Sequence, residues 1–151
     1  MGEMHPVPTG ATILVVEDEA LIGEMVAEAL QEQGFHVFVA SNGPDALRYV
    51  ESGAVVDALF TDIHMPGGMN GSELARRVRS LRPDMPVVYA SGRWHPTDRE
   101  RLAPRSAFLP KPYDPRDAGI LLMRLVASRW GETMPSSSPL PQREIVSQAS
   151  G

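Results

Sequence analysis

The sequence predicts an α/β fold in which a doubly wound, five-stranded parallel sheet is flanked by five helices. Short β-rich runs alternate along the chain with stretches of helical periodicity, which is the pattern of βαβ units. Polar side chains stand at the ends of several β-rich runs, where an open parallel sheet binds its ligands. The length of 151 residues suits one domain with a real core.

The predicted strands are short apolar runs of the size of buried parallel strands. They cover residues 12–16, 36–40, 57–61, 86–90 and 107–109. Because parallel strands are connected through crossover helices, we expect helices on both faces of the sheet.

Two helices are predicted between the first three strands. Apolar residues repeat at helical spacing from Ile22 to Leu30, and Gly34 follows as a helix-stop glycine. The second helix covers residues 45–50 and is entered through Asn42-Gly43-Pro44. Each helix therefore connects one strand to the next.

A third and a fourth helix follow the third and fourth strands. The third covers residues 72–81 and is stopped by Pro83. Thr97 and Glu100 have the spacing of a capping box, which opens a short fourth helix that Pro104 closes. Both helices fit the same alternating pattern.

The fifth helix begins at Asp114 and Pro115, a cap followed by proline at the first helical position, and is expected to reach about Trp130. Prolines and serines dominate the sequence soon after it, with little to bury, which predicts a flexible tail. We therefore divide the chain into an N-terminal extension at residues 1–10, a folded domain at 11–130 and a tail at 131–151.

The composition excludes several classes of protein. With 42% hydrophobic residues and a net charge of -5, the chain is typical of soluble globular proteins and offers no phosphate-tracking surface, so we expect no direct binding to nucleic acid. It has no cysteine for disulfides or thiol chemistry. No apolar run approaches the ~20 residues of a membrane span, and the first ten residues lack signal-peptide features. We expect a cytoplasmic protein without membrane contact.

Acidic, hydroxyl and basic side chains that could act together stand at the ends of four predicted strands. Glu17 and Asp18 follow the first strand, Asp62 the third, Ser91 the fourth, and Lys111, which is the only lysine, follows the fifth. A single acid at a strand end is commonly a solvated loop residue. Four such ends predict one shared pocket, because the carboxyl ends of parallel strands meet at one edge of the sheet.

The chemistry of this pocket points to a phosphoryl group. Three carboxylates close together are costly unless a cation joins them, and Mg²⁺ prefers such hard oxygen ligands while keeping waters. In phosphoryl transfer, a metal on one side and a lysine on the other neutralise the transferring oxygens, which suits Lys111. The Ser91 hydroxyl would donate to a further oxygen. We also expect the Lys111–Pro112 bond to be cis.

Four of five short motifs contain these residues: Val15-Val16-Glu17-Asp18-Glu19, Asp62-Ile63-His64-Met65-Pro66, Ala90-Ser91-Gly92 and Leu109-Pro110-Lys111-Pro112; the fifth is Asn70-Gly71. Through these motifs, over about residues 11–130, the chain resembles a response-regulator receiver domain of bacterial two-component signalling. The resemblance implies a flavodoxin-like fold, as in chemotaxis regulators.

Residue by residue, the resemblance implies how the acids would act. Asp62 is the nucleophile that takes phosphate from a histidine kinase or a phosphotransfer protein. Asp18 and Asp62 bind Mg²⁺ directly and Glu17 binds it through water, while the backbone carbonyl of His64 supplies a further ligand. The chain would then be a signalling phosphoacceptor that assists its own phosphorylation and dephosphorylation, and not an enzyme.

The resemblance also implies a switch. Ser91 holds the position of the switch hydroxyl, and Phe108 that of an aromatic residue that turns inward when the hydroxyl moves. Serine lacks the methyl group of the more usual threonine, so the coupling is expected to be looser. Gly67-Gly68 adds one residue to the loop after Asp62, as in some receivers attached to hybrid kinases.

The fifth helix suggests an output surface, because it carries apolar residues on two sides. One side should pack on the sheet: Ala118, Leu121, Leu122, Leu125 and Val126. The other side, which we call the output stripe, consists of Ile120, Met123, Ala127 and Trp130. With the fourth helix and fifth strand, this stripe is expected to bind a downstream protein or a second copy. The alternatives are that the tail folds over it or that these are scattered surface residues.

Parts of this pattern also fit other classes of protein. An aspartyl-phosphate-type phosphatase would use the same acid, metal and lysine, but typically needs a second acid two residues after the nucleophile, where this chain has His64. A flavodoxin-like cofactor binder would need a phosphate loop where Glu17-Asp18-Glu19 stands. Within signalling, the chain is either a freestanding regulator or the receiver fragment of a hybrid histidine kinase.

Overall fold

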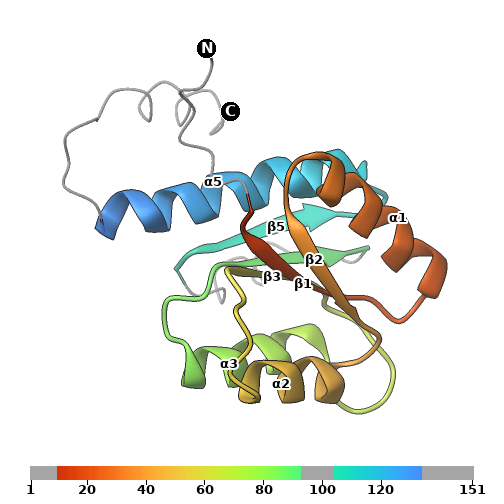
Figure 1. The fold of residues 1–151 in the computed structure, drawn as a ribbon. Helices are drawn as coiled ribbons and strands as arrows, with labels where there is room; N and C mark the ends of the chain where they lie inside the picture. The colour runs from red at the N-terminus through yellow and green to blue at the C-terminus, as the bar shows by residue number, and fades with distance from the viewer. Residues whose placement is uncertain (1–9, 93–103, 134–151) are drawn as a thin grey trace.

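One parallel sheet lies between two layers of helices (Figure 1). The computed structural model describes residues 10–92 and 104–133, with side chains up to Ser128. The strand order in the sheet is β2-β1-β3-β4-β5, and every neighbouring pair is parallel. The strands are β1 (Thr12–Val16), β2 (His36–Ala40), β3 (Ala58–Asp62), β4 (Val87–Ser91) and β5 (Ser106–Pro110).

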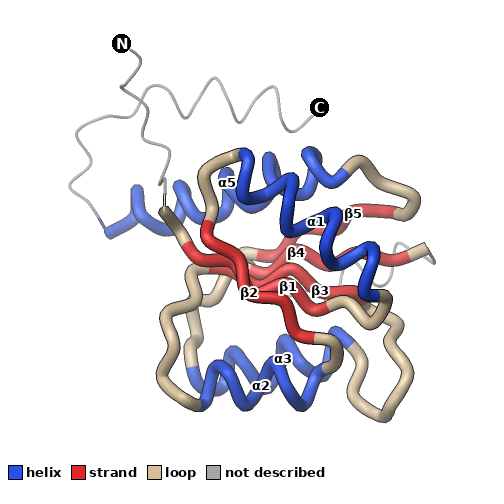
Figure 2. The backbone as a smooth tube through the Cα atoms, turned by 45° about the vertical axis from the view of Figure 1, so that its right-hand side comes forward, coloured by secondary structure: helices blue, strands red, loops and turns tan. Residues whose placement is uncertain are grey.

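Helices cover both faces of the sheet, which confirms the predicted doubly wound fold. Figure 2 shows α1 (Ala20–Glu32) and α5 (Pro115–Thr133) on one face, and α2 (Gly43–Glu51) and α3 (Gly71–Leu81) on the other. The helix predicted after β4 lies outside the described residues. α5 extends a few residues beyond its predicted end at Trp130.

Two of the strands begin and end one residue later than predicted. β3 begins at Ala58 because the Thr12 N–H donates to the Asp57 carboxylate at 2.7 Å, and not to a backbone carbonyl. β4 begins after Pro86, which has no N–H to donate. As a result Asp62 and Ser91 are the last residues of their strands, so the ladder itself positions their backbones.

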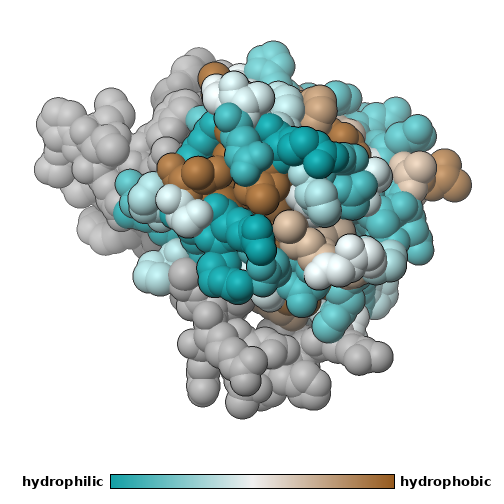
Figure 3. Space-filling view, turned by 90° about the horizontal axis from the view of Figure 1, so that it is seen from below, coloured by the Kyte–Doolittle hydropathy of each residue, from teal (hydrophilic) through white to brown (hydrophobic). Residues whose placement is uncertain are grey.

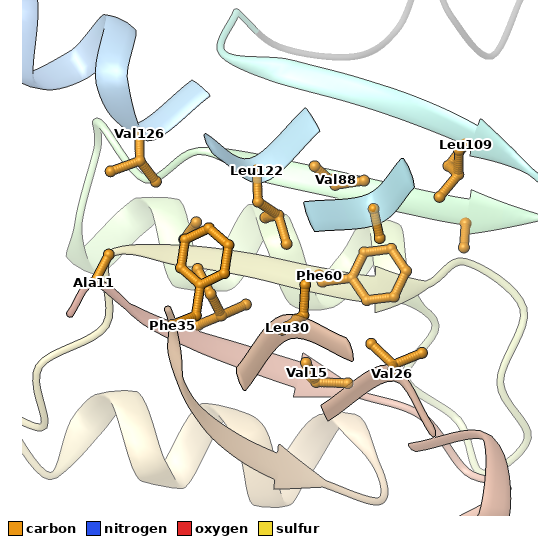
Figure 4. Close-up of a cluster of buried hydrophobic side chains, with 14 residues drawn as sticks. Ala11, Val15, Val26, Leu30, Phe35, Phe60, Val88, Leu109, Leu122 and Val126 are labelled. Atoms are coloured by element: carbon orange, nitrogen blue, oxygen red, sulfur yellow. The ribbon is translucent and has the colours of Figure 1, made fainter. Parts of the chain in front are cut away.

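The core consists of two clusters, one on each face of the sheet. Successive residues of β1 alternate between them: Ile13 and Val15 pack under α1 and α5, while Leu14 and Val16 pack over α2 and α3. Figure 4 shows the first cluster, where side chains from both helices meet the sheet. Strands buried on both faces need apolar residues at almost every position, which explains the continuous apolar runs.

Local signals set the ends of the helices. Gly34 follows α1 with φ of 100°, in the left-handed region, and its N–H donates to the Gln31 carbonyl at 3.0 Å. Asn42 and Asn70 cap α2 and α3, and each side chain accepts the N–H three residues ahead at 2.8 Å. These caps fix the loops that carry the polar residues at the edge of the sheet.

The surface of α2 and α3 is mixed in character. Figure 3 shows this face, where one patch of apolar residues is surrounded by hydrophilic ones. In the part of the chain that the structure covers, no helix combines the length and apolarity required to cross a bilayer.

Candidate functional site

Three carboxylates meet at the carboxyl edge of β1 and β3. Glu17 follows β1 directly, and Asp62 ends β3, the strand paired with β1. One carboxylate oxygen from each of Glu17, Asp18 and Asp62 lies within 4.8 Å of the other two. Glu17 and Asp62 are buried, while Asp18 is exposed and opens the group to solvent. The donor set consists of hard oxygens at this spacing, so it fits a divalent cation such as Mg²⁺.

Lys111 completes this group from the end of β5, which lies two strands beyond β3 in the sheet. Its Nζ lies 2.7 Å from Oδ1 of Asp62, and about a third of the lysine side chain is exposed. Its backbone N–H donates to the Ser91 carbonyl at 2.9 Å, and the Lys111–Pro112 bond is cis, as expected. Partial burial opposes the charge of Lys111, but the hydrogen bond and charge of Asp62, with Glu17, raise its pKa above the ordinary value.

Negatively charged side chains outnumber positively charged ones in this group. Burial raises the pKa of Glu17 to about 7, and the charges of Asp62 and Asp18 act in the same direction. The Glu19 N–H, which donates to Glu17 Oε2 at 3.1 Å, and the ammonium of Lys111 oppose this rise. One ammonium does not balance three carboxylates, so a metal ion would relieve the repulsion that remains.

Ser91 and Phe108 lie on the two strands beyond Asp62. Ser91 is buried at the end of β4, one residue past Ala90, which pairs with Asp62. Phe108 lies opposite Tyr89 in the register of β4 and β5, and it is half-buried against the α2 and α3 cluster. A path of adjacent strand residues therefore connects the acid group to β5.

Gly71 has a role that the sequence motif did not explain. A Cβ atom at this position would lie 2.9 Å from both the Asp62 carbonyl carbon and Ile63 Cα, and still closer to the Asp62 carbonyl oxygen. The Gly71 N–H donates to the Ile63 carbonyl at 2.8 Å. Glycine therefore allows the first turn of α3 to contact the backbone at Asp62. In the sequence, only the pair Asn70-Gly71 pointed to this close approach of α3 to Asp62.

Tyr113 was not predicted as part of the site. Its ring meets Phe60 edge to face, with centroids 5.7 Å apart, and its hydroxyl is buried with no hydrogen-bond partner among the described residues. Burial raises the pKa of Tyr113, and the charges of Glu17 and Asp62 raise it further. The signal for it in the sequence is an aromatic residue two positions after Lys111.

The remaining predicted residues lie as follows. His64 is exposed in the loop after β3, and the three-carboxylate group does not include its imidazole. In the output stripe, Ile120 is 41% exposed, whereas Met123 is half-buried and packs against the core. Ala127 is half-buried, and the side chain of Trp130 lies outside the described part. Met123 is therefore shared between the stripe and the core.

The fold and the site define a class: doubly wound α/β proteins with carboxylates, a hydroxyl and a lysine at the carboxyl edge of a parallel sheet. The family model of the response regulator receiver domain matches residues 13–120. The chain therefore belongs to the response regulator receiver domain family.

Individual relatives agree with this assignment. The chain is 35% identical over 108 residues to the DNA-binding transcriptional regulator NtrC of Rhizobium meliloti, covering 70% of this chain and 22% of that protein. It is 36% identical over 106 residues to the sensor kinase CckA of Brucella abortus, covering 68% of this chain and 11% of that protein. The chain thus spans less than a quarter of the length of these two relatives.

A solved structure has the same fold as this chain. The response regulator receiver protein from Sinorhizobium medicae is 32% identical, with a TM-score of 0.74. The match covers 80% of this chain and 97% of that one. The likeness therefore extends over nearly the whole of a receiver domain.

Proposed function

We propose that this chain is the phosphoacceptor of a two-component phosphorelay, with Asp62 as the residue that is phosphorylated. The observation that carries the proposal is the arrangement around Asp62: a lysine ammonium at 2.7 Å from its carboxylate and two further acids within 4.8 Å. This arrangement suits phosphoryl transfer, in which the protein mostly positions the reactants and neutralises charge.

In the transfer, a carboxylate oxygen of Asp62 attacks the phosphorus atom of a phosphohistidine. The P–N bond breaks, the imidazole takes up a proton, and an acyl phosphate forms on Asp62. Asp18 and Asp62 would hold Mg²⁺ directly, Glu17 through water, and His64 through its backbone carbonyl. When bound, the ion neutralises charge on the phosphoryl oxygens. The partner is a histidine kinase or a phosphotransfer protein, which places the reaction in the cytoplasm.

After transfer, Lys111 and Ser91 would bind phosphoryl oxygens. The ammonium is already beside Asp62, and the Ser91 hydroxyl is held at the end of the neighbouring strand. Movement of Ser91 would free space for Phe108 to turn inward from β5. Phosphorylation would thereby change the surface of β5 and α5, where a downstream protein or a second copy binds. The chain acts as a signalling phosphoacceptor, and not as an enzyme with turnover of its own.

The output stripe offers one direct test of that surface. Ile120 is its most exposed described member, so Ile120→Gln changes the surface without disturbing the core. We expect the native chain to increase in solution mass or to retain a partner when treated with beryllofluoride, a phosphate mimic, and the variant to do neither. Equal association of both proteins would remove the stripe from the proposal.

A second possibility is that the chain is the receiver part of a hybrid histidine kinase. The similarity to the sensor kinase CckA and the additional glycine in Gly67-Gly68 favour it. An aspartyl-phosphate phosphatase is less well supported, because His64 stands where such an enzyme typically has its second acid.

Intact-mass measurement tests the central claim. The native protein and Asp62→Asn are incubated with acetyl phosphate and Mg²⁺, and a phosphate adduct is expected on the native protein alone. An adduct on both proteins would place the phosphate on another residue, and an adduct on neither would overturn the phosphoacceptor assignment.

A further inference from the structure

β2 forms an open edge of the sheet. It pairs only with β1 in the described structure, and its ladder shows which backbone groups that pairing uses. The His36 N–H donates to the Ala11 carbonyl at 2.9 Å, and the Ala40 carbonyl accepts the Glu17 N–H at 3.1 Å. Because successive residues of a strand direct their N–H and C=O groups to opposite sides, those of Val37 and Val39 point outward. Four backbone groups are thus available to another strand.

The side chains of β2 do not protect this edge. Open edges are usually blocked by charged residues or proline, and β2 reads His-Val-Phe-Val-Ala. Phe38 and Val39 are each 41% exposed. Phe38 lies on the α2 face, where its ring stacks on Tyr49 with centroids 3.9 Å apart and planes 2° apart. The edge therefore presents an apolar and aromatic surface beside the available backbone groups.

A groove of about 1030 Å³ runs past this edge from α1 to α2. Figure 2 shows β2 at the near edge of the sheet, with α1 above it and α2 below it. On the α1 side the groove is lined by Leu21 and Met25, which are 74% and 56% exposed. It also reaches Glu17, the buried acid of the site. An extended segment lying along β2 would therefore contact both helices.

The charged residues of the groove indicate which side chains such a segment would have. Glu24 and Glu28 are exposed on its α1 wall, and neither forms an ion pair with any residue the structure describes. On the α2 wall, Asp45 and Arg48 pair with each other. Residues four apart on a helix are about 6 Å apart along its axis, close to the spacing of about 6.6 Å between alternate strand residues. Two basic residues at alternate positions of an added strand would match Glu24 and Glu28.

From these observations we propose that the groove binds an extended segment of a partner protein, which adds to β2 as a sixth strand. The segment carries basic residues on the side facing α1 and apolar residues on the side facing Phe38 and Tyr49. A second copy of this chain fits less well, because two-fold pairing of β2 strands would bring Glu24 and Glu28 of both copies to the same face. The groove reaches Glu17 of the acid group, but the proposal rests on β2 and the two helices beside it and does not depend on the phosphoacceptor function.

A peptide titration tests the proposal. The probe is a fluorescein-labelled, acetylated octapeptide in which lysine alternates with valine and phenylalanine, and the readout is fluorescence anisotropy with the full chain. A peptide of the same composition with its lysines contiguous is the control. We expect saturable binding of the alternating peptide that weakens as salt is raised, because paired charges at the surface are screened.

Two variants address separate parts of the groove. Val39→Pro removes one outward N–H at an edge position that tolerates proline, and Glu24→Lys with Glu28→Lys reverses the charge of the α1 wall. Each is expected to weaken peptide binding at least about fivefold, which corresponds to about 1 kcal/mol. Asp84→Lys, which reverses an exposed acid between α3 and β4, is a charge-reversal control outside the groove and should bind like the native chain. Circular dichroism checks that each variant is folded. If Val39→Pro does not fold, the charge-reversal variants alone test whether the groove binds the peptide.

The outcomes are distinct. Equal binding by the groove variants and the native chain, equal binding of the two peptides, or no binding at all would overturn the proposal. Sedimentation is measured in parallel. If the native chain dimerises and Val39→Pro is monomeric, a second copy occupies the edge and the partner proposal is wrong. None of these results bears on phosphorylation of Asp62, which the mass measurement decides separately.

Discussion

Replacing Gly71 with alanine tests how closely α3 must approach the backbone of the phosphoacceptor. The new Cβ atom would lie 2.9 Å from two backbone carbons at Asp62 and Ile63, whereas ordinary contacts begin at about 3.4 Å. The first turn of α3 and the end of β3 would therefore separate by at least about 0.5 Å. Both neighbours are backbone atoms, so no side chain can rotate away to relieve the contact.

The cost of this change follows from the same contacts. Overpacking a dense site costs about 1–3 kcal/mol, and weakening the hydrogen bond from the Gly71 N–H to the Ile63 carbonyl adds about 1 kcal/mol. The better helix propensity of alanine offsets less than about 1 kcal/mol. We expect Gly71→Ala to lower the free energy of unfolding by about 2 kcal/mol. Because Asp62 is displaced, phosphorylation should slow by about 10- to 100-fold.

Urea unfolding and the rate of phosphorylation by acetyl phosphate measure the two effects. Gly92→Ala is the matched control, because its Cβ would meet Lys111 Cβ at an ordinary 3.9 Å. The control should unfold within about 1 kcal/mol of the native protein. A Gly71→Ala protein with native stability and a native rate would refute the claim that this close approach positions Asp62.

Three further predictions concern the charged groups. Asp18→Asn should weaken Mg²⁺ binding and slow phosphorylation by at least about 10-fold, measured by metal titration and by intact mass, because the ion loses a direct ligand. Lys111→Arg should keep the fold but impair switching, measured by association in beryllofluoride, because a planar guanidinium does not fit where a compact ammonium did. The folded-state pKa of Glu17, about 7, lies above its unfolded value near 4.5. Its stabilising contribution is therefore full below about pH 4.5 and is lost as the pH rises through 7. The metal-free protein should lose up to about 3 kcal/mol of stability over this range, and Glu17→Gln should not.

Each of these has an outcome that contradicts it. Native Mg²⁺ affinity in Asp18→Asn would remove that residue from the metal site. Normal activation of Lys111→Arg would show that charge alone suffices. Parallel pH profiles for the native protein and Glu17→Gln, measured by thermal unfolding in chelator, would mean that Glu17 does not titrate in this range.

The elements that could be predicted are those with strong local signals. Asn42 and Asn70 cap their helices, and Gly34 ends α1, because a cap or a left-handed glycine acts within a few residues. The first residues of β3 and β4 were predicted one position too early. At β3 the reason is not local, because the Asp57 side chain takes the N–H of Thr12 on another strand.

The sequence by itself determined that a parallel sheet would bring Glu17, Asp62 and Lys111 to one edge, because alternating apolar runs allow few other arrangements. Only the tertiary structure decided how closely these groups meet and what their burial does to the pKa of Glu17. It also decided that Gly71 touches the backbone at Asp62 and that Phe38 is left at an open edge. Such features depend on distances and solvent exposure between segments far apart in the chain, which no local pattern encodes.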